Sequence, residues 1–166
     1  MRVGIGFDAH PFAEGRPLRL GGVDIPHTSG LRGHSDGDAL LHAITDAILG
    51  AAGLGSIGDR FPDTDPAWKG ADSSVFVERA RDLMADRGLD VGHLDALVIA
   101  ESPRIAPHAD AIRSRVASLL GVEEAVVSVR GTSSNGLGFT GRGEGVAAFA
   151  VVLLQPKSRI ENPRSK

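Results

Sequence analysis

The sequence predicts a single α+β domain, built on one mixed four-stranded sheet with a short hairpin near its N-terminus. Three observations lead to this prediction. The chain has 166 residues, the size of one ordinary domain. After the N-terminal hairpin, extended and helical patterns follow in the order β-α-β-α-β-β, which is typical of α+β proteins. The last extended segment, residues 146–154, is apolar on both faces, which indicates a strand that is covered on both sides.

The N-terminal third contains a strand, a hairpin and a helix. Residues 2–8 predict a strand, and a glycine pair closes a hairpin over residues 18–25. A helix follows, with Ser35 or Asp36 as its cap, and glycines end it. Its apolar residues recur at helical spacing and are Leu40, Leu41, Ile44, Ala47, Ile48 and Ala51.

The rest of the chain alternates helices and strands around two loops. Residues 52–71 show no periodicity, and a loop of this length is usually functional or disordered. A second helix begins at Asp72 or Ser73, and the apolar run 96–100 predicts a strand. A third helix begins near Pro107, a residue suited to the first turn.

Two strands close the chain, at residues 125–130 and 146–154, and flank a loop rich in Gly, Ser and Thr. The second apolar face of the last strand suggests cover by another subunit. We place the domain at residues 1–155 and expect a polar, solvated tail at residues 156–166.

Composition excludes several classes of function. A formal charge of −3, from 18 Lys and Arg against 21 Asp and Glu, leaves no electrostatic footprint for nucleic acid or anionic membranes. The lack of cysteine excludes disulfides and restricts any zinc site to His and carboxylate ligands. No signal peptide and no membrane-spanning apolar run is visible, so we expect a cytoplasmic protein.

Asp8 and His10 form a candidate metal site with His42. Side chains alternate along a strand, so Asp8 and His10 point to the same face, and His42 on the first helix supplies a third ligand. Three such ligands with an open fourth position are typical of catalytic zinc. The alternative for the strand pair is ordinary hydrogen bonding at a strand end.

Two aspartates share the helix face of His42. Asp46 lies four residues later and is placed to orient the imidazole, and Asp38 lies four residues earlier. For Asp38 the alternative is a favourable interaction with the helix N-terminus. His34 and Ser35 precede this helix, where free N–H groups favour a phosphate, although His34 is equally explained as a loop residue with a backbone partner. His27, His93 and His108 lack such company and are expected to be structural or surface residues.

The second glycine-rich loop contains G-x-G-x-x-G at residues 136–141, but a strand follows it instead of the helix that a dinucleotide fold requires. The hydroxyl and amide groups just before it suit a phosphate or a hydrated magnesium ion. The alternative is a flexible hairpin loop. These groups belong to Thr132, Ser133, Ser134 and Asn135.

Three long motifs resemble the 2-C-methyl-D-erythritol 2,4-cyclodiphosphate synthase family. They are SDGDALLHAITDAILG at residues 35–50, FPDTDP at residues 61–66 and GFTGRGEG at residues 138–145. The resemblance covers residues 1–155. It implies a homotrimer of chorismate-mutase-like subunits, with helices packed on one face of the sheet and active sites between neighbouring subunits.

The resemblance also implies an activity in the non-mevalonate isoprenoid pathway. The 2-phosphate of 4-diphosphocytidyl-2-C-methyl-D-erythritol 2-phosphate attacks its β-phosphorus and CMP leaves, which makes the enzyme a phosphorus-oxygen lyase. Such chemistry needs metal ions and oriented donors more than a protein nucleophile. The resemblance implies that zinc binds to Asp8, His10 and His42, that a magnesium ion bridges the diphosphate, and that His34 and Ser133 stabilise the transition state.

Substrate contacts follow from the same resemblance. Besides Asp8, His10, His34 and Ser133, the residues expected to bind substrate are Ser35, Ser56, Ile57, Gly58, Phe61, Pro62, Asp63, Thr64, Asp65, Ala100, Pro103, Arg104, Ala106, Thr132, Ser134, Asn135, Phe139 and Arg142. Of these, residues 56–58 face the ribose, 61–65 the methylerythritol moiety and 100–106 the cytosine, while Arg104 reaches the diphosphate. Phe139 and Arg142 line substrate or central-channel surfaces.

Two positions depart from the family pattern. Asn135 stands where the family commonly has a glutamate for magnesium, so the ion is held mostly by substrate phosphates and water. Ser56 stands where the family commonly has an aspartate against the ribose. Two other functions fit the residues, namely a zinc-dependent phosphohydrolase that uses the same triad and a trimeric module that binds isoprenoid diphosphates.

Overall fold

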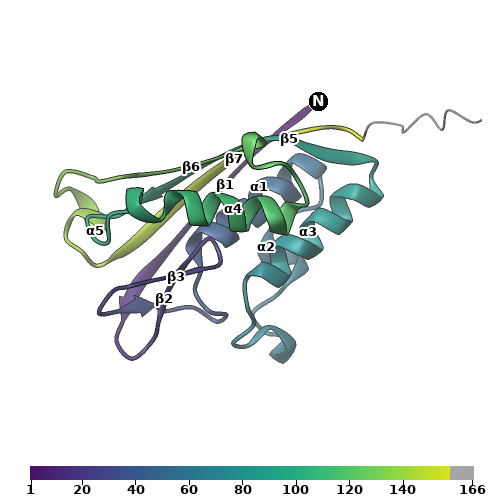
Figure 1. Ribbon diagram of the computed structural model, residues 1–166. Coiled ribbons are helices and arrows are strands. Elements are labelled where there is room, and N and C mark those ends of the chain that lie inside the picture. The colour runs from purple at the N-terminus through teal and green to yellow at the C-terminus, as the bar shows by residue number, and fades with distance from the viewer. Residues whose placement is uncertain (158–166) are drawn as a thin grey trace, which may run out of the picture.

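The structure is a computed structural model that describes residues 1–157 of the chain. One mixed sheet of five strands carries helices on one face (Figure 1). Its strands lie in the order β4-β1-β7-β5-β6, and only β5 and β6 run parallel. The bounds are β1 Arg2–Ala13, β4 Gly30–Leu31, β5 Leu89–Ile99, β6 Val127–Thr132 and β7 Gly145–Pro156.

The predicted single α+β domain with a mixed sheet is confirmed, but the count of four strands is wrong. The fifth strand, β4, has two residues and pairs with the end of β1, where Phe12 faces Leu31. A pairing of two residues leaves no alternating pattern in the sequence, because alternation needs several residues to be visible. Strand β1 also extends five residues beyond the predicted end at residue 8, to Ala13.

The predicted hairpin forms a separate two-stranded sheet of β2 (Leu18–Leu20) and β3 (Val23–Ile25). Gly21 and Gly22 make its turn, both with positive φ, a conformation that side chains other than glycine rarely adopt. Glycine at both turn positions is the signal that made the hairpin predictable.

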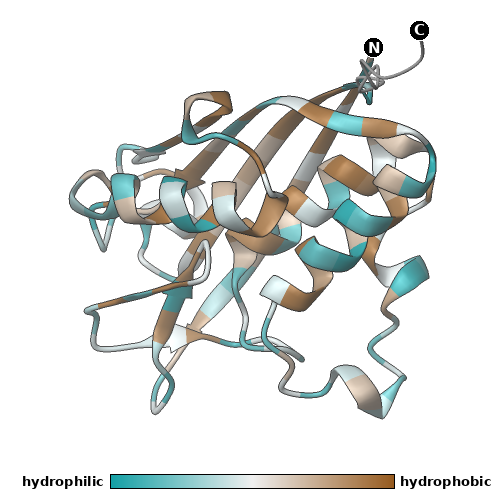
Figure 2. Cartoon of the chain, turned by 45° about the vertical axis from the view of Figure 1, so that its right-hand side comes forward, coloured by the Kyte–Doolittle hydropathy of each residue, from teal (hydrophilic) through white to brown (hydrophobic). Residues whose placement is uncertain are grey.

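Three long helices lie on the same face of the sheet (Figure 1). Helix α1 (Ala39–Ala52) packs against β1 and β7, α3 (Ser74–Asp86) against α1 and β5, and α4 (Ala109–Leu120) against β6. Figure 2 shows that apolar residues gather along the central strands and on the sides of the helices. Helix α1 is buried almost all round, which explains why its apolar residues exceed one helical stripe.

The two predicted loops contain short ordered elements. The stretch 52–71 holds α2 (Ile57–Arg60) and a 3₁₀ turn, Pro66–Trp68. The second glycine-rich loop holds α5 (Gly138–Gly141). Two further 3₁₀ turns, Ala106–His108 and Glu124–Val126, lie on either side of α4.

Glycines in β1 bring α1 unusually close to the sheet. A Cβ atom on Gly4 would lie 2.0 Å from the carbonyl oxygen of Ala47, and one on Gly6 would lie 1.9 Å from that of Ala43. The face of β1 that carries these glycines is therefore the face toward α1. Asp8 follows on the same face by strand alternation, which directs its side chain at this helix.

The opposite face of the sheet carries apolar side chains in the open. Val3 and Ile5 are each 69 % exposed, and the ring of Phe7 lies 4.7 Å from that of Phe149 on the neighbouring strand. Val151 continues the same patch. Among residues 1–157, nothing covers the second face of β7.

The predicted boundary between the domain and its tail falls within the last strand. Strand β7 runs to Pro156, one residue beyond the predicted domain end, and pairs there with Leu89. The predicted tail from residue 158 onward lies outside the described residues. No helix among residues 1–157 is long and apolar enough to cross a membrane.

Candidate metal centre and active site

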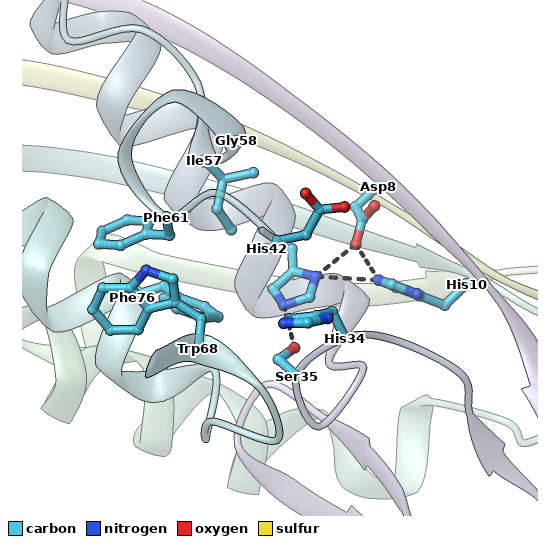
Figure 3. A pocket seen from close by; sticks show the side chains of 11 residues that line it. Asp8, His10, His34, Ser35, His42, Ile57, Gly58, Phe61, Trp68 and Phe76 are labelled. Atoms are coloured by element: carbon cyan, nitrogen blue, oxygen red, sulfur yellow. Dashed lines mark hydrogen bonds and ion pairs between the residues drawn. The ribbon is translucent and has the colours of Figure 1, made fainter. Parts of the chain in front are cut away.

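The predicted triad of Asp8, His10 and His42 comes together in the structure (Figure 3). Oδ2 of Asp8 lies 2.8 Å from Nε2 of His10 and 2.9 Å from Nδ1 of His42. The two histidine nitrogens are 3.1 Å apart. Three donor atoms from two elements therefore converge on one point, as the ligands of a bound cation do.

The elements explain this convergence. Asp8 and His10 alternate on β1 toward α1, and the glycines before them let the helix approach until His42 reaches the strand. The carbonyl oxygen of Arg32 lies 2.7 Å from Nδ1 of His10 and fixes its ring, which leaves Nε2 directed at the triad. A carbonyl behind a histidine is a common support for a metal ligand.

The charges of the triad reinforce one another. Burial disfavours the ionised form of Asp8, but hydrogen bonds from His10 and His42 outweigh it and lower the pKa of this carboxyl well below its ordinary value. Burial lowers the pKa of His10, but its hydrogen bond to Asp8, the charge of Asp8 and the carbonyl of Arg32 outweigh it, so the net pKa is raised. An ionised carboxylate is thus ready to bind a cation, and His10 must release a proton to do so.

Asp46 does not have the predicted role of orienting His42. Its Oδ1 accepts a hydrogen bond of 2.6 Å from the backbone N–H of Ile57, at the start of α2. Among the described residues, the groups at Nε2 of His42 are instead the hydroxyls of Ser35 and Ser73, at 3.0 and 2.9 Å. Sequence reasoning missed Ser73, which is 31 residues away in the chain and carries no motif signal of its own.

Asp38 caps α1, the alternative that sequence reasoning left open. Its carboxylate accepts hydrogen bonds from the N–H groups of Gly21, Gly22 and Leu41, at 2.9, 2.7 and 3.0 Å. The prediction of Ser35 or Asp36 as the cap is therefore wrong, and the cap is Asp38. Because Asp38 also binds the turn of the hairpin, it joins the hairpin to α1.

The anion site predicted at the start of α1 is partly occupied by hydrogen bonds within the chain. The N–H groups of Gly37 and Asp38 donate to the side chains of Ser35 and Asp36, at 3.3 and 3.2 Å. His34 and Ser35 line the pocket beside the triad.

The triad lies in a pocket of about 350 Å³ (Figure 3). Aromatic side chains form the side opposite the triad. There the ring centre of Phe61 lies 5.3 Å from that of Trp68 and 5.0 Å from that of Phe76. Trp68 and Phe76 escaped prediction as site residues because apolar residues at helical or loop positions are ordinarily core. The predicted residues that line this pocket are Asp8, His10, His34, Ser35, His42, Ile57, Gly58, Phe61 and Asp63.

Several predicted substrate residues lie outside this lining. The exposed Ser56 is the cap of α2, and its hydroxyl donates to Asp59 at 2.8 Å. Asp65 caps the following 3₁₀ turn through the N–H of Ala67 at 2.9 Å. Among the predicted residues between 56 and 65, Pro62 and Thr64 are the other two outside the lining.

A second pocket, of about 190 Å³, lies between the ends of β5 and β6. It collects the predicted residues Ala100, Arg104, Ala106, Thr132 and Ser133, while Pro103, Ser134 and Asn135 are not in its lining. Within one chain, His34 and Ser133 therefore line different pockets, although both were predicted to act on one transition state.

Glu101 lines this second pocket and organises its loop, which sequence reasoning missed. Its Oε1 accepts hydrogen bonds from the N–H groups of Ser134 and Gly136, both at 3.1 Å. Asn135 between them has a positive φ of 54°, a conformation that asparagine tolerates better than most residues.

Phe139 lines a third pocket, of about 210 Å³, together with His10 and Glu144. Arg142 pairs with Glu144 at 2.6 Å.

The fold and the site together define a class of protein, namely a single mixed-sheet α+β domain that carries an Asp-His-His metal-type triad in an open pocket. A family model described as the YgbB family matches residues 1–155. The chain belongs to the YgbB family.

Curated relatives match nearly the whole chain. The 2-C-methyl-D-erythritol 2,4-cyclodiphosphate synthase of Bacillus cereus (strain ATCC 10987 / NRS 248) is 53 % identical over 94 % of this chain and 99 % of its own. That of Halalkalibacterium halodurans is 54 % identical over 93 % of this chain and 98 % of its own.

Solved structures agree with this fold. A 2C-methyl-D-erythritol-2,4-cyclodiphosphate synthase in a CDP-bound form matches with a TM-score of 0.85 and 41 % identity over 93 % of this chain and 100 % of its own. The IspF–CDP complex of Plasmodium falciparum matches with a TM-score of 0.83 and 36 % identity, over 95 % of this chain and 97 % of its own. The bifunctional IspDF of Campylobacter jejuni matches with a TM-score of 0.90 and 44 % identity. The match covers 93 % of this chain and 42 % of that longer protein.

Proposed function

We propose that this chain converts 4-diphosphocytidyl-2-C-methyl-D-erythritol 2-phosphate into 2-C-methyl-D-erythritol 2,4-cyclodiphosphate and CMP, the reaction of its curated relatives. An oxygen of the 2-phosphate forms a bond to the β-phosphorus, the bond from that phosphorus to CMP breaks, and no water is consumed. The observation that carries the proposal is the convergence of Asp8, His10 and His42 in a pocket wide enough for a substrate.

Zinc is the metal that the triad fits. Two imidazole nitrogens and one carboxylate oxygen lie within 4.8 Å of one another, and three such ligands are the usual protein donors of a catalytic zinc ion. When bound, the ion supplies Lewis acidity toward a phosphoryl oxygen, which offsets charge that develops during the attack.

His34 and Ser35 are the residues of the triad pocket that we assign to the substrate phosphates. Both side chains line the pocket beside the triad, and an imidazole or a hydroxyl there donates to phosphoryl oxygens. Donors that are already fixed before the reaction lower the barrier more than donors that must reorganise. The aromatic side formed by Phe61, Trp68 and Phe76 excludes water around the methylerythritol moiety.

The second pocket is the part of the site that we assign to the nucleotide. Arg104 adds a positive charge for the diphosphate, and residues 100–106 present backbone groups to the cytosine. Ser133 adds a hydroxyl donor at the edge of the pocket. A magnesium ion would be held mainly by phosphates and water, because Asn135 offers only a neutral oxygen.

A homotrimer explains how two separate pockets can bind one substrate. Apolar side chains at Val3, Ile5, Phe7, Phe149 and Val151 form an uncovered face, and burying such a patch favours association. In a closed ring of copies, the second pocket of one subunit can meet the triad pocket of its neighbour. Residence in the cytoplasm stays a prediction from the sequence.

Phosphorus NMR of the products tests the proposal. With zinc, magnesium and the cytidyl substrate, we expect a cyclic diphosphate and CMP in equal amounts. In water enriched in oxygen-18, cyclisation leaves both products unlabelled, whereas label in a linear phosphate would identify a phosphohydrolase and overturn the proposal. His42→Ala should abolish turnover, and Arg79→Ala, on the exposed side of α3, is the matched control.

A further inference from the structure

Ser73 occupies a helix cap without using its hydroxyl to cap the helix. It is the N-cap of α3 and is fully buried, yet its side chain makes no capping hydrogen bond. Asp72 takes over that role, because its Oδ1 accepts from the N–H of Ser74 at 2.9 Å. A buried serine at a cap position ordinarily binds the helix N–H groups, so the different direction of this hydroxyl calls for another reason.

The hydroxyl of Ser73 lies between His42 and Asp36. Its Oγ is 2.9 Å from Nε2 of His42 and makes a short hydrogen bond to Oδ1 of Asp36. The backbone N–H of Ser73 donates to the other oxygen of the same carboxylate at 3.1 Å. Each oxygen of the Asp36 carboxylate thus accepts one hydrogen bond from Ser73.

The directions of these hydrogen bonds form one consistent set when a metal is bound. Nδ1 of His42 faces Asp8 and His10, so a metal ion held by the triad would take the lone pair of that nitrogen. The ring proton then resides on Nε2 and must be donated. The hydroxyl of Ser73, beside that of Ser35, accepts this hydrogen bond, and Ser73 donates its own O–H to the carboxylate of Asp36, which can only accept.

The carboxylate of Asp36 is itself held in place. Nη1 of Arg19 lies 3.6 Å from its Oδ2, and the backbone N–H of Asp36 donates to the carbonyl of Ala71 at 3.0 Å. Gly70 donates in turn to the carbonyl of His34 at 2.8 Å. The pair of Asp36 and Ser73 is therefore part of a rigid contact between the His34 loop and the start of α3.

We propose that Asp36 and Ser73 are positioning residues of the metal centre, which hold the imidazole of His42 in the tautomer and orientation that present Nδ1 to the metal. This inference rests on the proposed metal at the triad. Partners that bind the distant nitrogen of a ligand histidine generally raise its affinity for the metal by about 10- to 100-fold.

Zinc affinity is the measurement that tests this role. Competition with a chromophoric chelator should show that Ser73→Ala weakens zinc binding by about 10- to 100-fold. Ser74→Ala is the matched control, because it removes the neighbouring hydroxyl, which binds Asp72 and not His42, and zinc affinity should then stay within about twofold. Asp36→Asn is a second variant that keeps the shape of the side chain but weakens the acceptor, and we expect an intermediate loss.

A readout independent of affinity comes from nitrogen-15 NMR of the histidine rings in the zinc-loaded protein. The proton on Nε2 of His42 should be visible and protected from exchange in the natural protein, and exposed to exchange in Ser73→Ala. Wild-type affinity together with an unchanged Nε2 proton in Ser73→Ala would overturn the positioning role and leave the proposed function standing. Failure of the natural protein to bind zinc, with His42→Ala no different, would overturn the metal centre and the positioning role together.

Discussion

His42 is held through both ring nitrogens, one toward Asp8 and His10 and the other toward Ser35 and Ser73. A histidine fixed on both sides loses little freedom when it binds a metal, so more of the interaction energy remains as affinity. At the scale of single residues, the contacts at both ring nitrogens distinguish the site from three polar side chains that merely lie close together.

The state of His10 predicts how zinc binding depends on pH. The pKa of His10 is raised above its ordinary value of 6.5, because the hydrogen bond and charge of Asp8 and the carbonyl of Arg32 outweigh burial. Zinc must displace that proton. As the pH is lowered, apparent zinc affinity should therefore begin to fall while the pH is still above 6.5. Below that point it should decrease by about tenfold per pH unit for each displaced proton. Isothermal titration across about pH 5.5 to 8.5 would measure this dependence.

The zinc-free protein should show the opposite trend in stability. A raised pKa in the folded state means that protonated His10 stabilises the fold at a pH below its unfolded pKa of about 6.5, and this contribution is lost as pH rises through the folded pKa. Urea unfolding of the natural protein and of His10→Gln should differ at pH 5.5 and converge at pH 8.5. A constant difference across this range would contradict the assignment of the charge to His10.

At the scale of elements, the contact between β1 and α1 positions the triad. Gly4 and Gly6 leave no room for a side chain, and the helix backbone occupies that space. The distance between strand and helix is then short enough for Asp8 and His42 to share a proton or a cation. The glycines are therefore as necessary to the site as its ligands.

Gly6→Ala tests this contact. Its Cβ would meet the carbonyl oxygen of Ala43 at 1.9 Å, so the strand or the helix must shift. We expect the free energy of unfolding to fall by about 2 kcal/mol or more, as for other overpacked cores, and zinc affinity to fall with it. Urea titration and chelator competition measure the two effects.

Gly50→Ala is the matched control for that variant. Gly50 lies within α1, and a Cβ there meets nothing within 4 Å. Alanine is favoured over glycine inside helices, so this change should stabilise the protein by up to about 1 kcal/mol. Equal effects of the two substitutions would show that the close approach of β1 and α1 is not what matters.

The carboxylate of Asp38 joins two elements, because it caps α1 and binds the hairpin turn. Asp38→Ala leaves two buried N–H groups and one partly buried N–H group without their acceptor, and an unpaired buried donor costs about 1–3 kcal/mol. We expect a loss of at least about 2 kcal/mol in the free energy of unfolding. The exposed Asp110→Ala, in the first turn of α4, should change it by less than about 0.5 kcal/mol.

At the scale of the whole molecule, the exposed apolar face of the sheet predicts the assembly. Ile5 is 69 % exposed at the centre of that face, between Val3 and Phe7. Ile5→Glu would place a charge in the proposed interface, where burial without a partner is unfavourable. Sedimentation should then show monomers in place of trimers, with turnover lost because the two pockets no longer meet.

Zinc binding separates this prediction from simple unfolding. The triad belongs to one chain, so a monomeric Ile5→Glu protein should still bind zinc with nearly natural affinity. Glu78→Lys, on the exposed side of α3, is the control and should leave the assembly intact. A natural protein that sediments as a monomer would contradict the proposed trimer directly.

Local patterns in the sequence were sufficient for most elements and for the ligands of the site. Alternation on a strand placed Asp8 and His10 together, and the glycine pair at residues 21–22 predicted the hairpin. The three motifs that resemble the synthase family were confirmed by the match of the family model over residues 1–155. These features depend on neighbours in the chain, so short-range geometry determines them.

Only the tertiary structure decided what surrounds the ligands. The sequence by itself favoured Asp46 as the partner of His42, since it lies four residues away on the same helix, but Ser73 and Ser35 hold that position. It also could not separate the pocket of His34 from that of Ser133 or detect the two-residue strand β4. The physical reason is that these contacts join segments tens of residues apart, and packing of α1 against β1 and α3, not local propensity, brings them together.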